Sequence, residues 1–316
     1  MKSIWTMGEM IVEIMRPRPE MPHEIPDVYF GPFPSGAPAI MISAAARMGV
    51  PCGIIGGVGR DAHGQMMLER LESYGVDCSK VLLSDKRSTG NAFVMYHDDG
   101  SREFIFHIAG TSATECGVPN LSDVKEPGFF HIMGCSLTAD EEYCHRIVET
   151  AGKFKELGAK ISFDPNVRPE LLKSGNFREI ISPVIDNCSI LLPGVDELLM
   201  ISGVCTVDSA VSKLFENPIL DVIVLKRGSK GCTVYTRESS EDVSACKIDE
   251  EKDATGAGDC FDGAFLAALT EGLSLSLAAR NANAAGALNA AAFGPLEGNI
   301  SPATVAEMVS RQYGVV

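Results

Sequence analysis

The sequence predicts an α/β fold in which a largely parallel sheet carries helices on both faces. Short runs of β-branched and other apolar residues alternate with segments of helical periodicity, and this alternation is typical of parallel sheets. Hydrophobic residues make up 45% of the 316 residues, which is enough to bury one large core. We therefore expect a single domain over residues 1–316.

The regular alternation occupies the middle of the chain. The strand-like runs are CGIIGGVG, FFHIMG, KISFD, SILLP and DVIVLK. The first four are followed by helix-like segments at 62–75, 140–157, 177–187 and 195–202. From residue 258 onward the pattern is helical, and the stretch AARNANAAGALNAAA has enough alanine for neighbouring backbones to approach closely.

Two extended segments, about 9–33 and 88–107, interrupt this alternation. The second reads NAFVMYH, then the turn DDG, then SREFIFH, which is the signal of a β-hairpin. We expect the two segments to form a small antiparallel lid beside the main sheet.

Charge and composition exclude several classes of function. With 27 basic and 42 acidic side chains the formal charge is −15, which disfavours nucleic acid and anionic membranes as partners. The ten cysteines contain no C-x-x-C pair and the six histidines no H-x-x-x-H pair, so a zinc site or a disulfide framework is not expected. No apolar stretch approaches the ~20 residues that span a bilayer, so we expect a cytoplasmic protein.

The stretch KDATGAGDCFDGAFLAA, residues 252–268, places small residues and a carboxylate at the start of a predicted helix. The backbone amides of Gly256, Ala257 and Gly258 can converge on one point there, and the positive end of the helix dipole adds to the attraction for an anion. Asp259, in the first turn, can take a proton from a hydroxyl group. Phosphoryl transfer to an alcohol needs this pairing of a base with an anion cradle.

Two other interpretations of the glycine-rich segments are open at this point. In the first, Asp253 caps a turn, Asp259 satisfies the helix dipole and the glycines only permit a bend. In the second, GVGRDA at 57–62 and the acidic Asp77 belong to a nicotinamide-binding oxidoreductase. That motif follows a second strand rather than the first, and it leaves residues 253–265 unexplained. A P-loop, G-x-x-x-x-G-K-[ST], does not occur.

The sequence DATGAGDCFDGAF resembles the D-T-x-G-A-G-D signature of the ribokinase-like (PfkB-type) sugar kinases. The resemblance covers nearly the whole chain. FPSGAPAIMISAAARMG resembles the sugar-binding segment of that family, and GGVGRDAHGQMMLERLESYGVD resembles its next strand, turn and helix. It implies a ribokinase-like three-layer α/β/α sandwich with a mostly parallel central sheet and a small antiparallel β lid. Because lid edges pair in several relatives, we expect a homodimer.

The resemblance also implies roles in catalysis. Asp259 would be the catalytic base, and Gly256, Ala257 and Gly258 would form the anion hole. Asp253 would help to coordinate a monovalent cation such as K⁺. Glu197 in LLPGVDEL would be linked to Mg²⁺ and phosphate, although the asparagine usual at the position of Gly194 is missing.

On the nucleotide side, VIVLKRGSKGC resembles the strand and turn that border ATP, with Lys226, Gly228 and Gly231 near the nucleotide. Asn283 matches a residue close to the adenine. The alternative for Asn283, on a helix rich in alanine, is a hydrogen bond to backbone.

The departures from the family pattern indicate the sugar. Glu13 in GEMIVE takes the place of an aspartate that binds sugar hydroxyls, and Gly36 and Ala37 belong to the sugar-binding segment. Ile40 replaces a usual asparagine, so one polar contact with the sugar is lost and the pocket is more apolar. Ile108 stands where acid-sugar kinases have the arginine that binds the substrate carboxylate.

GPFPSGAPAI resembles the corresponding segment of tagatose kinases within this family, and DPNVR at 164–168 resembles that of fructokinases and 2-keto-3-deoxygluconate kinases more than that of ribokinases. We therefore expect a neutral ketohexose, tagatose or fructose, phosphorylated by ATP on its terminal hydroxymethyl group. Arg102 and Arg168 could still serve an acid, which keeps 2-keto-3-deoxygluconate as the alternative substrate; both could equally form structural ion pairs. A sugar-binding regulator that has lost catalysis is a further alternative, because Gly194 departs from the pattern.

Overall fold

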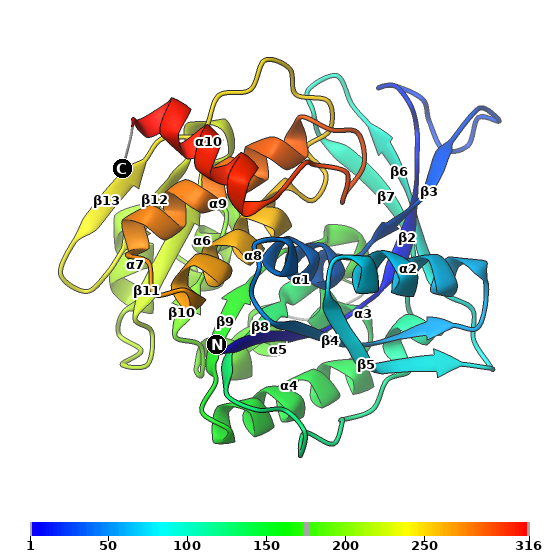
Figure 1. Cartoon of the computed structure of the whole chain (residues 1–316), viewed down its shortest axis with the longest axis horizontal. Helices are drawn as coiled ribbons and strands as arrows, with labels where there is room; N and C mark the ends of the chain where they lie inside the picture. Colours follow the sequence, from blue (N-terminus) through cyan, green and yellow to red (C-terminus); the bar gives the residue numbers. More distant parts are fainter. Residues whose placement is uncertain (1, 173–176, 315–316) are drawn as a thin grey trace.

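The computed structural model describes residues 2–172 and 177–314 (Figure 1). In this part of the chain nine strands form the main sheet in the order β13-β12-β11-β10-β9-β8-β1-β4-β5. All neighbours from β5 to β11 are parallel, and only the β11–β12 and β12–β13 pairs are antiparallel. The strands are β1 Ser3–Met7, β4 Cys52–Gly59, β5 Val76–Ser84, β8 Pro127–Met133, β9 Lys160–Asp164, β10 Ile190–Leu191, β11 Val222–Lys226, β12 Cys232–Tyr235 and β13 Ser240–Val243.

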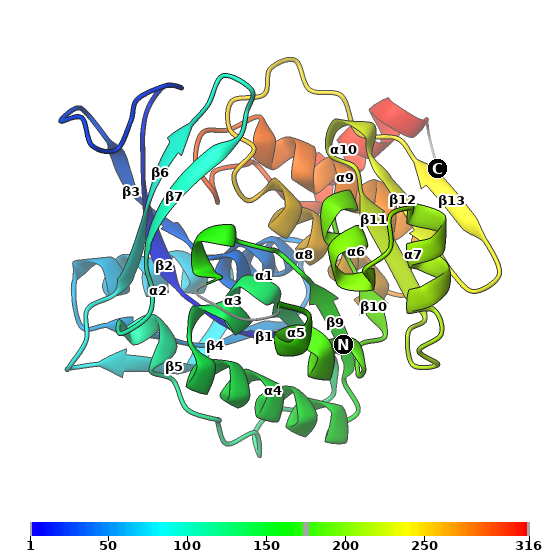
Figure 2. The same ribbon diagram turned by 180° about the vertical axis from the view of Figure 1, so that it is seen from behind.

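Helices cover both faces of this sheet, as Figures 1 and 2 show from opposite sides. One layer holds α1 Ala37–Arg47, α2 Ala62–Ser73, α8 Ala257–Thr270, α9 Leu275–Ala290 and α10 Pro302–Tyr313. The other holds α3 Gly134–Ala139, α4 Glu141–Glu156, α5 Phe177–Ile185, α6 Val195–Ser202 and α7 Val207–Leu214. Alternate side chains of β1 enter separate apolar cores, Ile4 on one face and Trp5 and Met7 on the other. The predicted three-layer sandwich is confirmed.

The small residues of α1, α8 and α9 let these helices pack closely. A Cβ atom added to Gly263 of α8 would lie 2.2 Å from the backbone oxygen of Met41 in α1, so only glycine fits there. Ala264, Ala267 and Ala268 of α8 are buried in the same core. This packing fixes α8 against the sheet and sets the position of its N-terminus.

A second, four-stranded sheet has the order β3-β2-β6-β7 and is called the lid sheet below. Its strands are β2 Ile11–Met15, β3 Phe30–Ser35, β6 Gly90–Tyr96 and β7 Arg102–His107. The predicted small sheet is therefore present, with one difference. β2 and β6 pair in parallel, whereas the two hairpin pairs are antiparallel. The chain passes through α1, β4, α2 and β5 between β3 and β6, and so long a connection permits a parallel pair.

The turn after β4 joins the main sheet to the lid sheet. Asp61 caps α2 by accepting from the Gly64 amide (N···O 2.9 Å), and it also accepts from the amide and hydroxyl of Thr89, next to β6 (2.8 and 2.7 Å). An added Cβ on Gly57 would lie 2.2 Å from the Ser112 oxygen. The glycines of GVGRDA thus face protein backbone, and packing rather than a nicotinamide cofactor accounts for them.

In the part of the chain that is described, none of the helices combines the length and the hydropathy that crossing a membrane would require.

Candidate active site

The glycine-rich loop before α8 is held in place by neighbouring side chains. Gly256, the N-cap of α8, has a φ angle of 75°, in the left-handed region that favours glycine. One carboxylate oxygen of Asp253 accepts from the Thr255 amide at 2.9 Å, and the other accepts from the Gly294 amide at 3.0 Å. The side-chain amide of Asn289 donates to the Thr255 carbonyl at 2.8 Å. We call residues 253–258 the anion loop.

Backbone amides of the anion loop at the start of α8 remain available as donors. The N–H groups of Gly256 and Gly258 have no acceptor among the described residues, whereas the Ala257 amide donates to the Ala254 carbonyl at 3.2 Å. Of the three amides predicted to be free, that of Ala257 is therefore not available, because its N–H group forms a hydrogen bond within the turn that leads into the helix. The two free donors and the positive end of α8 make this point attractive to an anion.

Asp259 lies in the first turn of α8 with only 6% of its surface exposed. One of its carboxylate oxygens accepts from the side-chain amide of Asn166 at 3.0 Å. Burial raises the pKa of Asp259 to about 6, while the positive charge of Arg168 acts in the opposite direction. A carboxylate whose pKa is near neutrality is suited to receive a proton from a hydroxyl group.

Asn166 was not predicted as a site residue. It follows β9 with a φ angle of 37°, and its backbone amide donates to Asp164 at 3.0 Å. This backbone conformation aims its side chain at Asp259. The available signal was an asparagine two residues after a buried strand, since Asn tolerates positive φ better than most residues.

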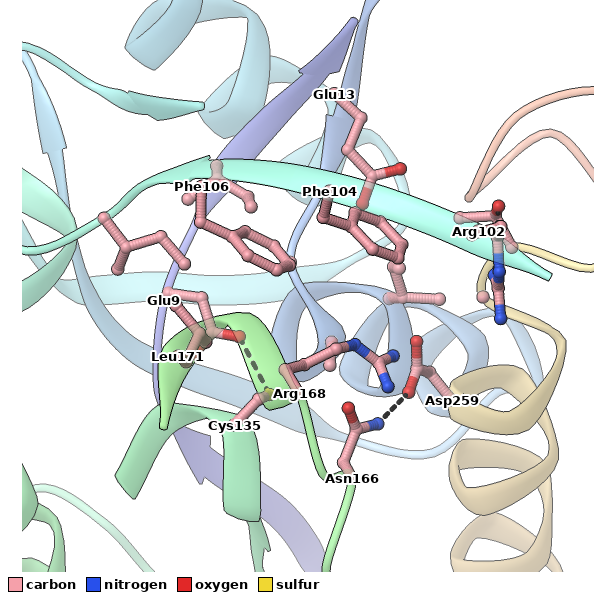
Figure 3. Close-up of a pocket in the computed structure, with 17 residues that line it drawn as sticks. Glu9, Glu13, Arg102, Phe104, Phe106, Cys135, Asn166, Arg168, Leu171 and Asp259 are labelled. Carbon is pink, nitrogen blue, oxygen red and sulfur yellow. Dashed lines mark hydrogen bonds between the residues drawn. The ribbon is translucent and has the colours of Figure 1, made fainter. Parts of the chain in front are cut away.

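A pocket lies between the anion loop and the lid sheet (Figure 3), with a volume of about 440 Å³ when the open space at its mouth is included. All five residues predicted to bind substrate line it, together with Asp259 and Gly256: Glu13, Gly36, Ala37, Arg102 and Arg168. Ile40 and Ile108, the two apolar departures from the family pattern, line it too. The pocket residues that sequence reasoning missed are Glu9, Ile11, Phe104, Phe106, Cys135, Asn166, Leu171 and Thr255.

Two buried glutamates enter this pocket from β2 and the residues just before it. Burial raises the pKa of Glu13 to about 7, and one of its carboxylate oxygens has no hydrogen-bond partner among the described residues. Burial also raises the pKa of Glu9, which accepts from Ser136 Oγ at 2.5 Å and from Cys135 Sγ at 3.1 Å. Glu13 is thus the carboxyl group with unused hydrogen-bonding capacity for a ligand.

The lid sheet contributes an aromatic wall. Phe104 and Phe106 stack with their ring centroids 5.0 Å apart, and Figure 3 shows both rings extending from β7 into the pocket. The guanidinium groups of Arg102 and Arg168 each lie within 6 Å of the Phe104 ring centroid. Within the described ranges, neither arginine forms an ion pair with a carboxylate, so the structural ion pairs considered from the sequence are not formed.

Lys226 occupies a buried cluster rather than open space. Its Nζ lies 2.7 Å from Asp164 and 3.2 Å from Asp262. Burial alone would lower the pKa of Lys226, but these two carboxylates raise it above its ordinary value. Burial raises the pKa of Asp262, whereas Lys226 keeps that of Asp164 low despite burial. As a nucleotide-binding residue, Lys226 stays a prediction.

The other residues predicted on the nucleotide side have structural partners. Gly228 begins the short 3₁₀ helix Gly228–Lys230, and Gly231 follows it with a φ angle of 88°. An added Cβ on Gly231 would lie 2.1 Å from the Val243 oxygen. The side-chain amide of Asn283 donates to the Ser244 carbonyl at 3.1 Å, which matches the backbone-binding alternative, and its contact with adenine stays a prediction.

Glu197, predicted to be linked to Mg²⁺, closes the start of α6. One of its oxygens accepts from the Gly194 amide at 2.7 Å and the other from the Val167 amide at 2.8 Å. Residues 2–172 and 177–314 hold no group of three His, Cys, Asp or Glu side chains arranged to bind a metal. Kinases commonly hold Mg²⁺ through one or two carboxylates and the substrate phosphates, so a single glutamate fits that role.

The comparisons with known proteins agree with this geometry. The model of the pfkB family carbohydrate kinases matches residues 1–301. Fructokinase-1 of Oryza sativa subsp. japonica is 33% identical over 270 residues, covering 81% of this chain and 82% of the relative.

Solved structures give the same result. A putative ribokinase II from E. coli, in complex with ATP and Mg²⁺, is 35% identical with a TM-score of 0.91, covering 98% of this chain and 100% of that one. A double mutant of the Vibrio cholerae O395 fructokinase, bound to fructose, ADP and a potassium ion, shares the fold at 24% identity, a TM-score of 0.82 and 98% coverage of both chains. The chain belongs to the pfkB family of carbohydrate kinases.

Proposed function

We propose that this kinase transfers the γ-phosphoryl group of ATP to the terminal hydroxymethyl group of a neutral ketohexose, with fructose the first candidate and tagatose the second. The observation that carries the proposal is the position of Asp259. Its buried carboxylate faces the pocket beside the free amides of Gly256 and Gly258, so a sugar hydroxyl there would meet both a base and an anion cradle.

The chemistry follows from these positions. The hydroxyl oxygen of the sugar attacks the γ-phosphorus and forms a new O–P bond while its proton passes to Asp259. The bond between that phosphorus and the bridging oxygen breaks, and its electron pair leaves with ADP. The amides of Gly256 and Gly258 stabilise the charge on the phosphoryl oxygens. Asn166 holds Asp259 in the orientation that the proton transfer requires.

We place ATP beside the turn after β11, where Lys226, Gly228, Gly231 and Asn283 were predicted to border it. The E. coli relative in complex with ATP and Mg²⁺ supports this cofactor pair. When bound, Mg²⁺ would neutralise charge on the nucleotide phosphates. Glu197 is the residue proposed to be linked to the metal, and Asp253 to a monovalent cation such as K⁺.

The pocket walls support a neutral sugar. Ile40, Ile108 and Leu171 offer no hydrogen-bonding groups, and Phe104 and Phe106 offer flat apolar faces on which a sugar ring can stack. Glu13 has a carboxylate oxygen available for a sugar hydroxyl. The identity to several fructokinases, including the one from rice, supports fructose as the first candidate.

A second candidate is 2-keto-3-deoxygluconate, an acid sugar. It is favoured by Arg168, whose guanidinium lines the pocket and has no carboxylate partner within the described ranges. Ile108 weighs against it, because the arginine that binds the substrate carboxylate in acid-sugar kinases is absent at that position.

We also propose a homodimer formed through the lid sheet. Ile25, Val28, Phe30 and Ile105, on or next to the lid sheet, are exposed by 53%, 55%, 49% and 41%. Pairing of two lids would cover part of this apolar surface. Light scattering after size-exclusion chromatography is expected to give twice the mass of one chain, and a monomeric mass across micromolar concentrations would contradict the proposal.

The pH dependence of the reaction tests Asp259 as the base. Because only the carboxylate accepts a proton, kcat at saturating sugar should fall as the pH drops below the pKa of about 6. Arg168→Gln removes a positive charge that lowers this pKa, so the acid limb should move to higher pH. Glu13→Gln is the matched control, since it removes the other carboxyl group with a pKa near neutrality yet should leave the limb in place. If the acid limb of the pH profile shifts in Glu13→Gln, the assignment of Asp259 as the base is contradicted.

Substitution of the base gives a direct measurement. Asp259→Asn should lower kcat by at least ~10²-fold, the lower range for general-base catalysis, with little change in substrate affinity. Asp77→Asn, at an exposed carboxylate of β5 outside the pocket, should leave kcat unchanged. Near-normal turnover by Asp259→Asn, with an unchanged melting temperature, would show that another group takes the proton.

A coupled assay of ADP release identifies the sugar. Fructose, tagatose, ribose, 2-keto-3-deoxygluconate and adenosine should be compared by kcat/KM, and the highest value is expected for one of the two ketohexoses. A value for the acid sugar at least ~10-fold above both ketohexoses, about 1.4 kcal/mol in transition-state binding, would establish the second candidate instead.

A further inference from the structure

Arg102 lies at the end of the pocket where the phosphoryl group is transferred. It is the first residue of β7 in the lid sheet, and its Nη1 donates to Thr255 Oγ1 at 3.1 Å. Thr255 immediately precedes Gly256 in the anion loop. Figure 3 shows the guanidinium group extending from the lid sheet toward the start of α8, on the side of Asp259 that faces away from Glu9.

The direction of β7 separates this end from the rest of the pocket. Arg102, Phe104 and Phe106 alternate with exposed residues, so their side chains share the face of the strand that lines the pocket. Four residues of strand advance by roughly 13 Å. Phe106 therefore lies well along the pocket from the anion loop, whereas Arg102 lies over it. Arg102 is thus poorly placed for the part of a sugar near Phe106.

The charge on Arg102 is available for an anion. Lys226 is compensated by Asp164 and Asp262, whereas Arg102 contacts a neutral hydroxyl and the face of Phe104. The carboxylates of Glu13 and Asp259 act on Arg102 only through space, without an ion pair. No ion pair involves Arg102 in the part of the chain that the structure describes. In a protein of net charge −15, a cation beside the anion loop is a local feature that would stabilise negative charge developing on a transferred group.

We propose that Arg102 is a catalytic residue whose guanidinium group contacts the γ-phosphoryl oxygens during transfer. The amides of Gly256 and Gly258 approach the group from the helix, and Arg102 approaches it from the lid sheet. During transfer, negative charge spreads over the three equatorial oxygens of the phosphoryl group. The amides and Arg102 then stabilise this charge from two sides. The hydroxyl of Thr255 holds the guanidinium at this point beforehand.

This arrangement would link phosphoryl transfer to the lid. The amides of Gly256 and Gly258 lie at the N-terminus of α8, which is fixed against the main sheet, but Arg102 belongs to the lid sheet. The cradle for the phosphoryl group is complete only with the lid sheet over the pocket, where a bound sugar would contact Phe104 and Phe106. Without sugar, the attack of water on the γ-phosphorus would lack the stabilisation by Arg102. Hydrolysis of ATP in the absence of sugar would therefore be slow.

Two substitutions separate a catalytic role from a structural one. Arg102→Gln removes the charge and keeps a side chain that can bond Thr255, so kcat with the best sugar should fall by at least ~10²-fold. KM for that sugar should stay within about threefold, because the contact is made in the transition state. Arg102→Lys keeps a positive charge but lacks the planar guanidinium group with its paired N–H donors. Its kcat should lie between those of Arg102→Gln and the parent enzyme. Glu103→Gln, the exposed neighbour on β7, is the matched control and should match the parent enzyme.

Binding of a transition-state mimic gives a readout other than activity. With sugar present, ADP and aluminium fluoride should bind to Arg102→Gln far more weakly than to the parent, while ATP alone should bind to both with similar affinity. A kcat for Arg102→Gln within about threefold of the parent would overturn the proposal. So would a sugar KM raised more than about tenfold at unchanged kcat, because that pattern places Arg102 on the ground-state sugar.

Discussion

The burial of Asp259 is the constraint on which the rest of the site depends. A carboxylate taken out of water is destabilised unless charges and hydrogen bonds compensate it. Here the compensation comes from three directions: the N-terminus of α8, the amide of Asn166 and the positive charge of Arg168. Because they compensate only part of the cost, the pKa stays raised to about 6. The arginine and the asparagine that follow β9 thus offset part of the burial that raises the pKa of Asp259.

Further from the pocket, the cluster of Lys226, Asp164 and Asp262 connects three elements. Asp164 ends β9, Lys226 ends β11 and Asp262 lies in α8, so the ion pairs fix the helix to the carboxyl edge of the parallel sheet. Removing one member of a buried pair typically costs about 3–5 kcal/mol, because the partner is left uncompensated. The orientation of α8, and with it that of Asp259, therefore depends on a cluster that does not line the pocket.

Short sequence patterns predicted the features of this molecule that depend on residues adjacent in the chain. The glycines of the anion loop and Asp259 are adjacent in the sequence, so the start of α8 and the carboxylate in its first turn could be inferred together. The side-chain contacts of Glu9 and Asn166 could not be. Asn166 meets Asp259 across 93 residues, and Glu9 meets Cys135 across 126, so each pairing exists only once the sheet is assembled. The parallel pairing of β2 with β6 was not predicted for the same reason, since it depends on the path of the chain from β5 to the lid sheet.

The amide of Ala257 illustrates a finer limit of sequence reasoning. Three consecutive small residues suggested three free donors, but a chain that turns into a helix uses some of its amides to close the turn, and Ala257 bonds to Ala254. The amides of Gly256, Gly258 and Asp259 are then left as donors for the oxygens of a phosphoryl group. These amides approach the pocket from one side, and the lid sheet lines it from the other. The proposed roles are divided accordingly: α8 would supply the base and part of the anion cradle, while the lid sheet would supply Arg102 and the walls against the sugar. Because the two are separate elements, the sugar preference can change through lid and pocket residues such as Ile40 and Ile108 while the catalytic end stays intact.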